Sequence, residues 1–370
     1  MKFLQMRKDS MIPVLEPFLT DKAKEYVNDC LDTNWISSKG KYVQKFEEYF
    51  GEKFGYENVM SVSNGTTALH LALEVFNIGE GDEVIVPDLT FAASINCVFH
   101  AHATPVIADV EKETWNISVD DILSMITDKT KAVIVVHLYG QAFDVKMLKE
   151  KLPRKDILII EDCAEALGAK VNNEYVGTYG DAATFSFFGN KVITTGEGGA
   201  IVYKNKNDLE KSKVMRDHGM SPAIKYQHDY IGYNYRMTNI QAAIGLSQLE
   251  FLDELVKVRK QIFNFYDSYI ESLGFKRVKS TDECPWLYTT LVPEGKSRDS
   301  LIEFLAANGI ETRPMFKPMS SMDIYRNVIS GDIKNSKYLS ERGISLPSSY
   351  SLSPDQLNTI RVLIEGWTNE

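Results

Sequence analysis

Short runs of apolar residues alternate, over the first part of the chain, with stretches in which apolar residues recur at helical spacing. Four runs have the length and content of buried strands: residues 83–87, 105–109, 132–136 and 157–160. The stretches 93–100 and 119–126 between them favour helices. Strands that alternate with helices predict a mostly parallel sheet with helices on both faces, which is a three-layer α/β/α domain.

The pattern changes near residue 240, where apolar positions at helical spacing run through Ile244, Leu249 and Leu255. We expect a long connecting helix here, followed by a smaller α+β lobe. The expected elements of that lobe are strands at 285–292 and 310–314 and helices at 299–308 and 354–366. The change predicts a large domain over residues 12–250 and a small C-terminal domain over residues 251–370.

Composition and charge narrow the class of protein. The chain has 370 residues, 44% of them hydrophobic, and its formal net charge of −10 argues against nucleic acid or an anionic membrane as the main partner. Neither the four cysteines nor the six histidines show the spacing of a metal site or a disulfide framework. Cys163 can be interpreted as a nucleophile, but a buried, inert thiol is favoured.

Two further features bear on location. No apolar run approaches the roughly 20 residues that would span a bilayer. Residues 1–10 carry charges and lack the apolar stretch of a signal peptide; they are either a short extension or an early start. We therefore expect a cytoplasmic enzyme that requires no metal and no membrane.

Lys191 lies between an aromatic-rich segment and a glycine-rich turn, in the run 184–199 (TFSFFGNKVITTGEGG). A lysine amine becomes a nucleophile when burial or a nearby cation lowers its pKa, which is what an imine-forming lysine needs. Most lysines are solvated, so an isolated lysine at this place would more simply be a surface residue at a strand end. The chemical interpretation depends on the residues that accompany it.

The acids that follow the run 157–160 are the first companion. In open α/β sheets ligands bind beyond the carboxyl ends of the strands, and right-handed crossovers gather those ends at one edge, where we expect Asp109, His137 and Asp162 to converge. An aspartate there can keep a ring nitrogen protonated, so that the ring accepts electrons, as pyridoxal phosphate enzymes require. Asp162 would equally serve as a helix N-cap, and Asp109 as a turn residue.

Residues 63–67 (SNGTT) are the second companion, and they precede a stretch of strong helix formers. Backbone N–H groups at a helix start, together with hydroxyls, make an anion site suited to a phosphate. Many helices with such caps bind nothing. The presence of Lys191 and Asp162 on the same chain favours a phosphate site at this segment.

Together these segments resemble the sugar aminotransferases of the DegT/DnrJ/EryC1/StrS family, which are fold-type I pyridoxal phosphate enzymes. The resemblance runs from about Ile12 to the C-terminal region. It is carried by segments 12–14, 35–41, 63–67, 161–166, 185–199 and 233–239. A related dehydratase branch has histidine at the lysine position, so Lys191 favours amino transfer.

The resemblance implies a role for each matched residue. Lys191 would bind the cofactor covalently and shuttle a proton, and Asp162 would pair with the pyridine nitrogen; these are the expected catalytic residues. Phe91 would stack on the ring. The expected pyridoxal phosphate contacts are Gly65, Thr66 and Ser186 at the phosphate and Glu165 near O3′. The other expected contacts are Phe91, Asp162, Lys191 and Asn234. Because Asn234 would reach the neighbouring subunit's phosphate, the resemblance also implies a homodimer with shared active sites.

The resemblance further implies a nucleotide-linked 4-keto-6-deoxy sugar as amino acceptor and L-glutamate as amino donor, with ping-pong kinetics. Segments 35–41, 136–141 and 185–199 favour the branch that acts on GDP-linked sugars; dTDP- or UDP-linked sugars and a small phosphorylated ketone stay open. A non-catalytic regulatory relative that only holds the cofactor is another alternative.

The expected substrate contacts are Arg313, Lys41, Trp35 and Arg236. A guanidinium suits a diphosphate because its fork makes paired hydrogen bonds. Each charged member of this set could instead form an ion pair at the surface or at a subunit interface.

Overall fold

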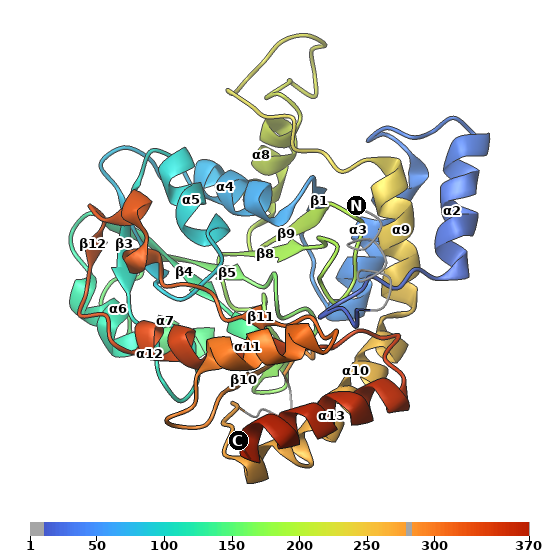
Figure 1. The fold of residues 1–370 in the computed structure, drawn as a ribbon. Helices are drawn as coiled ribbons and strands as arrows, with labels where there is room; N and C mark the ends of the chain where they lie inside the picture. The colour runs from blue at the N-terminus through green and yellow to red at the C-terminus, as the bar shows by residue number, and fades with distance from the viewer. Residues whose placement is uncertain (1–10, 279–282, 370) are drawn as a thin grey trace.

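The computed structural model describes residues 11–278 and 283–369 and places an eight-stranded sheet at the centre of a large lobe (Figure 1). In spatial order the strands are β1 (Val59–Val62), β9 (Gly199–Tyr203), β8 (Ala182–Ser186), β5 (Leu158–Asp162), β4 (Thr130–Val136), β2 (Glu83–Pro87), β3 (Thr104–Ala108) and β12 (Ile329–Ser330). Strand β9 runs antiparallel to β1 and β8, and every other neighbouring pair is parallel. The expected mostly parallel sheet is confirmed.

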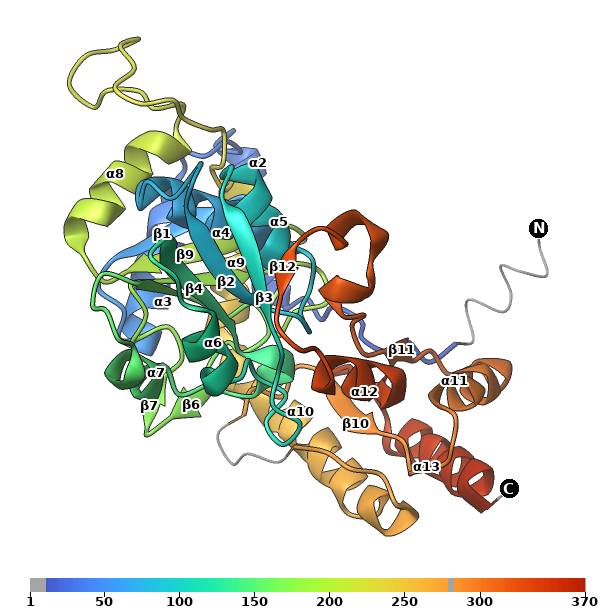
Figure 2. The same ribbon diagram turned by 90° about the vertical axis from the view of Figure 1, so that its left-hand side faces the viewer.

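Helices cover both faces of this sheet. Successive residues of a strand point to opposite faces, so they pack alternately against one layer of helices and the other. In β4, Ile134 and Val136 pack on the side of α4 (Gly65–Val75) and α5 (Ala93–His100). Val133 and Val135 pack on the opposite side with α6 (Val119–Met125) and α7 (Val145–Lys151) (Figure 2). Strands that are buried on both faces read as continuous apolar runs, which is the pattern seen in the sequence.

Four more helices lie around the antiparallel side of the sheet. Helices α2 (Asp21–Asp32) and α3 (Lys41–Phe54) pack against α9 (Asn239–Glu250). Helix α8 (Lys206–Arg216) packs against α4, and the segment between α8 and α9 projects away from the body of the molecule (Figure 1).

The single long helix expected from residue 240 is wrong, because the structure has two helices there. Helix α9 ends at Glu250, and α10 (Leu252–Asp267) begins after Phe251, whose φ of −102° and ψ of 0° interrupt the helical geometry. Helix α9 packs against α2 and α3 of the large lobe, whereas α10 continues into the small lobe. The apolar spacing continues across Phe251, so it gave no sign of this change in direction.

The small lobe is a three-stranded antiparallel sheet with helices against it. Its strands are β10 (Tyr288–Leu291), β13 (Gly343–Leu346) and β11 (Arg313–Pro314), and its helices are α11 (Arg298–Ala307), α12 (Asn335–Arg342) and α13 (Pro354–Asn369). Two segments cross between the lobes: Ile12 N donates to Gly309 O at 2.8 Å, and β12 pairs with β3 of the large sheet. The domain limits at 12–250 and 251–370 stay a prediction.

Among the residues that the structure describes, none lies in a helix with the length and apolar character needed to cross a membrane.

Candidate active site

A pocket of about 620 Å³ opens at the carboxyl edge of the parallel strands, between the sheet and the small lobe. Strands β5 and β8 end there at Asp162 and Ser186, and α4 begins there. The sequence-predicted residues that line the pocket are Gly65, Thr66, Phe91, Asp162, Glu165, Ser186, Lys191 and Arg313. The fold therefore brings together residues that lie up to 248 positions apart, from Gly65 to Arg313.

Lys191 lies in the loop between β8 and β9, where its backbone N–H donates to Phe188 O at 2.9 Å. Its Nζ is 3.9 Å from Glu165 Oε1, and only 13% of its side chain is exposed. Burial lowers the pKa of the Lys191 ammonium, although Glu165 and Asp162 act in the opposite direction. A lysine with a depressed pKa is closer to the neutral amine that attacks a carbonyl group.

Asp162 is buried at the end of β5. Its Oδ2 accepts a hydrogen bond from Ser94 Oγ at 2.9 Å, and its Oδ1 accepts one from Ala164 N at 3.1 Å. Burial raises the pKa of Asp162, while these two hydrogen bonds and the Lys191 ammonium counteract the rise. The side chain therefore faces the pocket as an acid whose charge needs a cationic partner.

The N-terminus of α4 forms an anion cradle. Asn64 caps the helix by accepting from Thr67 N at 2.9 Å, while the Thr67 hydroxyl accepts from Asn64 N at 3.2 Å. The N–H groups of Gly65 and Thr66, in the first turn, have no acceptor within the helix. A Cβ on Gly65 would lie 2.8 Å from Ser186 Cβ, so only glycine lets the helix start approach Ser186 this closely. These groups fit a phosphate.

Phe91 and Glu165 complete the wall near Lys191. Phe91 is 60% exposed although it lines the pocket, which suits an aromatic face that a flat ring would cover. Glu165 Oε2 accepts from Tyr139 N at 2.7 Å. Burial raises the pKa of Glu165 to about 7, and the Lys191 ammonium opposes this rise.

The remaining predicted residues do not line this pocket within one chain. Lys41 Nζ is 2.8 Å from Asp29 Oδ2, and Trp35 is 56% exposed. Arg236 pairs with Asp217 and donates to Asn234 Oδ1 at 2.8 Å, in the projecting segment between α8 and α9. Their roles at a partner's site stay predictions. Arg313 lines the pocket and is 3.8 Å from Glu311.

Of the three polar residues expected at one sheet edge, only Asp162 lines the pocket. Asp109 lies after β3, where its carboxylate accepts from the N–H groups of Asn335 and Ser336 and so caps the start of α12. The three residues follow parallel strands to one edge of the sheet, as expected, but Asp109 does not share the pocket of Asp162. The turn-type interpretation of Asp109 is nearer to its use here.

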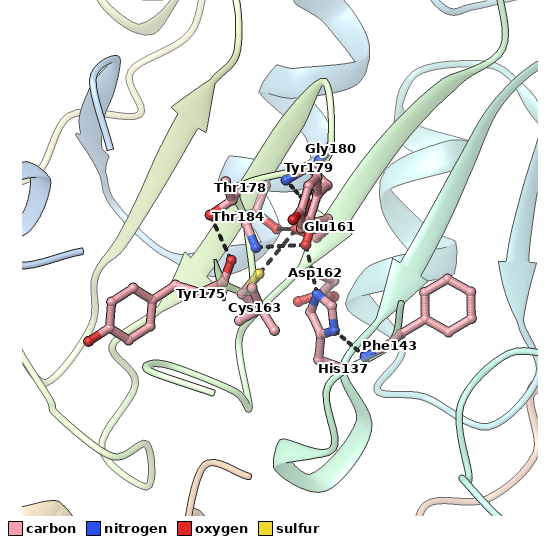
Figure 3. Close-up of polar contacts among 12 residues, drawn as sticks. His137, Phe143, Glu161, Asp162, Cys163, Tyr175, Thr178, Tyr179, Gly180 and Thr184 are labelled. Atoms are coloured by element: carbon pink, nitrogen blue, oxygen red, sulfur yellow. Dashed lines mark hydrogen bonds and ion pairs between the residues drawn. The ribbon is translucent and has the colours of Figure 1, made fainter. Parts of the chain in front are cut away.

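His137 takes part in a separate buried cluster with Glu161 and Cys163, whose ligand-type atoms lie within 4.8 Å of one another (Figure 3). Glu161 accepts from the N–H groups of Gly177, Tyr179 and Gly180 and bonds to His137 Nε2 at 3.0 Å. Because Phe143 N donates to His137 Nδ1 at 3.0 Å, Nε2 carries the proton. These hydrogen bonds already occupy the atoms that would bind a metal. The cluster holds the loop after β7 (Glu174–Tyr175) in place through its three backbone N–H groups.

Sequence reasoning missed Ser94 and Trp286. Ser94 orients Asp162 from α5, and Trp286 lines the pocket from the small lobe. Neither residue belongs to a recognisable motif. Tyr139 and Phe316 also line the pocket.

Comparisons with known proteins agree with this geometry. A model of the DegT/DnrJ/EryC1/StrS aminotransferase family matches residues 17–364. GDP-perosamine synthase of Escherichia coli O157:H7 is 47% identical over 353 residues, which cover 94% of this chain and 95% of that protein.

Solved structures extend the likeness to the fold. A Streptococcus pneumoniae structure described as a sugar aminotransferase in its PMP form is 28% identical, with a TM-score of 0.92 over 97% of this chain and 98% of that one. A variant of GDP-4-keto-6-deoxymannose-3-dehydratase with bound GDP-perosamine is 25% identical, with a TM-score of 0.88 over 95% of this chain and 100% of that one.

Proposed function

This chain belongs to the DegT/DnrJ/EryC1/StrS aminotransferase family, and from that premise we propose that it converts GDP-4-keto-6-deoxymannose to GDP-perosamine with L-glutamate as amino donor. It is a pyridoxal phosphate-dependent aminotransferase, and the relatives place its product in polysaccharide biosynthesis. The observation that carries the proposal is one pocket that holds Lys191, Asp162 and the α4 N-terminus together.

The pocket residues fit pyridoxal phosphate. When bound, the cofactor supplies a cationic ring that stabilises negative charge at the substrate carbon. The N–H groups of Gly65 and Thr66 and the Ser186 hydroxyl would hold its phosphate. Asp162 would keep the proton on its ring nitrogen, and the exposed face of Phe91 would pack on the ring.

Lys191 carries out the proton transfers. Its amine would hold the cofactor through the aldehyde group, and it would be free while the amino donor occupies the site. The free amine, with a pKa lowered by burial, removes a proton from the donor carbon as general base. In each half-reaction Lys191 would both take up and deliver one proton, and in the second the delivery would be to C4 of the sugar.

Arg313 is the pocket residue best suited to an anionic substrate group, because its guanidinium lines the cavity and its contact with Glu311 is long. Trp35, Lys41, Asn234 and Arg236 lie outside the pocket of their own chain. We assign them to the site of a partner subunit in a cytoplasmic homodimer.

A panel of keto sugars tests the substrate. Purified enzyme is incubated with L-glutamate and GDP-, dTDP- or UDP-linked 4-keto-6-deoxy sugars, and the product mass and the stereochemistry at C4 are determined. We expect the GDP-linked sugar to be preferred and its C3 hydroxyl to be retained. Loss of that hydroxyl would indicate the dehydratase reaction, and inactivity on the whole panel would favour a regulatory relative.

Mixed dimers test the shared site. Asn234→Ala and Lys191→Ala chains should each be impaired alone, and mixing them should restore activity, because one site then combines Lys191 of one chain with Asn234 of the other. Full activity in isolated single chains, measured by solution scattering, would contradict the shared site.

A further inference from the structure

The Lys191 amine lies over an aromatic face that has no part in the function proposed so far. Nζ is 4.0 Å from the centroid of the Trp286 ring and 3.9 Å from Glu165 Oε1. At that distance the Glu165 contact is an ion pair without a hydrogen bond. The indole face is therefore a principal contact of the amine.

Trp286 is fixed in place by the loop that carries Lys191. Its Nε1 donates to Asn190 O at 2.6 Å, and its ring stacks on Tyr139 with centroids 5.7 Å apart and an interplanar angle of 18°. Only 2% of Trp286 is exposed. The residue precedes β10, so the small lobe supplies this wall of the site.

Tyr139 connects the indole to Glu165. Its backbone lies in the left-handed region, with φ 50° and ψ 32°, which is unusual for a bulky residue and is found at functional sites. In this conformation its N–H donates to Glu165 Oε2. Lys191, Trp286, Tyr139 and Glu165 thus form a closed ring of contacts, which we call the amine cradle.

An ammonium in this pocket loses most of its hydration. The charged or titratable groups that face it are Glu165, Asp162, Cys284 and Arg313, of which Arg313 repels it. The π face of an indole stabilises a desolvated cation without accepting its proton. It can therefore hold the amine in reach of the substrate carbon while leaving the proton available.

We propose that Trp286 is a positioning residue that holds the Lys191 amine beside the reacting carbon while that amine is not joined to the cofactor. The proposal rests on the function given above, in which the amine is free from the entry of the amino donor to the end of the second half-reaction. The chemistry remains that of Lys191, and Trp286 acts through it.

Two substitutions separate the ring face from the hydrogen bond. Trp286→Phe and Trp286→Leu both remove the bond to Asn190 O, but only phenylalanine keeps an aromatic face. Full-length enzyme is converted to its amino form with L-glutamate and desalted, so that Lys191 is free. It is then pulsed with acetic anhydride over a pH series, and acetylation of Lys191 is quantified by mass spectrometry, with exposed Lys155 in the same sample as the reference.

We expect the acetylation midpoint of Lys191 to fall by about one pH unit in Trp286→Leu and by clearly less in Trp286→Phe, because loss of the π face destabilises the ammonium. Below the midpoint this corresponds to roughly tenfold faster acetylation in the leucine variant. Equal midpoints in the two variants, or a leucine midpoint equal to that of the wild type, would overturn the proposal.

Two controls keep the result interpretable. If the leucine variant does not fold, Trp286→Met takes its place and the same comparison with phenylalanine is made. Borohydride reduction of the wild-type enzyme with pyridoxal phosphate must trap an adduct on Lys191. Absence of that adduct refutes the proposed function, whereas a trapped adduct with unmoved midpoints refutes the role of Trp286 alone.

Discussion

Ser94 Oγ donates a 2.9 Å hydrogen bond to Asp162 Oδ2 across 68 positions of sequence, from the first turn of α5 to the end of β5. The bond lies inside the protein, where both residues are buried. It fixes the orientation of the carboxylate and, together with Ala164 N, favours its ionised form against the cost of burial. In the proposed function, this orientation suits Asp162 to a protonated ring nitrogen before any cofactor binds.

Replacing Asp162 tests whether its oriented carboxylate contributes to catalysis. Asp162→Asn keeps the shape but removes the charge, and we expect kcat to fall by about 10²-fold or more, as for other preorganised electrostatic groups. Ser94→Ala should cost about tenfold, which corresponds to one hydrogen bond to a charged group. Steady-state kinetics with the GDP-linked keto sugar measures both, and wild-type kcat in Asp162→Asn would remove Asp162 from the mechanism.

Lys191→Ala should abolish both amino transfer and the borohydride-trappable adduct, because Lys191 is the only lysine among the described residues that line the pocket. The chain should stay folded, since the substitution removes a charge from a buried site. Circular dichroism tests whether the variant is folded, and mass spectrometry tests whether the adduct is present. Robust turnover by this variant would refute the role given to Lys191.

The pH dependence of the free energy of unfolding should reveal the titration of Glu165. Its pKa is about 7 in the folded chain against an ordinary value of 4.5, because of burial. Between these values the folded chain holds a proton that the unfolded chain has released, so this group lowers stability as the pH rises from about 4.5 to 7. Over that interval the loss amounts to about 3 kcal/mol.

Glu165→Gln removes this titration. In urea unfolding of the cofactor-free protein, the stability of the variant relative to the wild type should increase by about 3 kcal/mol from pH 4.5 to 8. A difference that stays constant with pH would contradict the raised pKa.

Glu161 should matter for stability and not for chemistry. Its carboxylate accepts three backbone N–H groups besides its bond to His137, and Glu161→Gln would turn an N–H donor toward some of them. We expect a loss of about 2–4 kcal/mol in the free energy of unfolding. Glu174→Gln, at an exposed position of β7, is the matched control and should change stability little.

Gly40 permits the close approach of segment 35–41 to α9. A Cβ at this position would lie 2.0 Å from Asn239 Cγ, and Asn239 holds the segment by accepting from Tyr42 N and donating to Trp35 O. Gly40→Ala should therefore destabilise the chain by about 1–3 kcal/mol and raise KM for the nucleotide sugar. Gly366→Ala in α13, where a Cβ meets nothing within 4 Å, should be neutral or slightly stabilising.

The sequence by itself determined the fold class and the central residues of the candidate site. Alternating strands and helices predict the layered sheet, and Lys191, Asp162 and residues 63–67 belong to short segments whose chemistry is visible locally. A strand end and a helix start are properties of neighbouring residues, so a linear pattern can record them.

Only the tertiary structure decided which distant side chains serve those residues. Ser94 reaches Asp162, and Trp286 reaches Asn190 and Lys191, after the chain has folded back over 68 and 96 positions respectively. The tertiary structure also placed Asp109 at the start of α12, outside the pocket that Asp162 lines, and interrupted the helix at Phe251. Such contacts arise from the packing of whole elements against one another, and no local periodicity specifies which residue will face which.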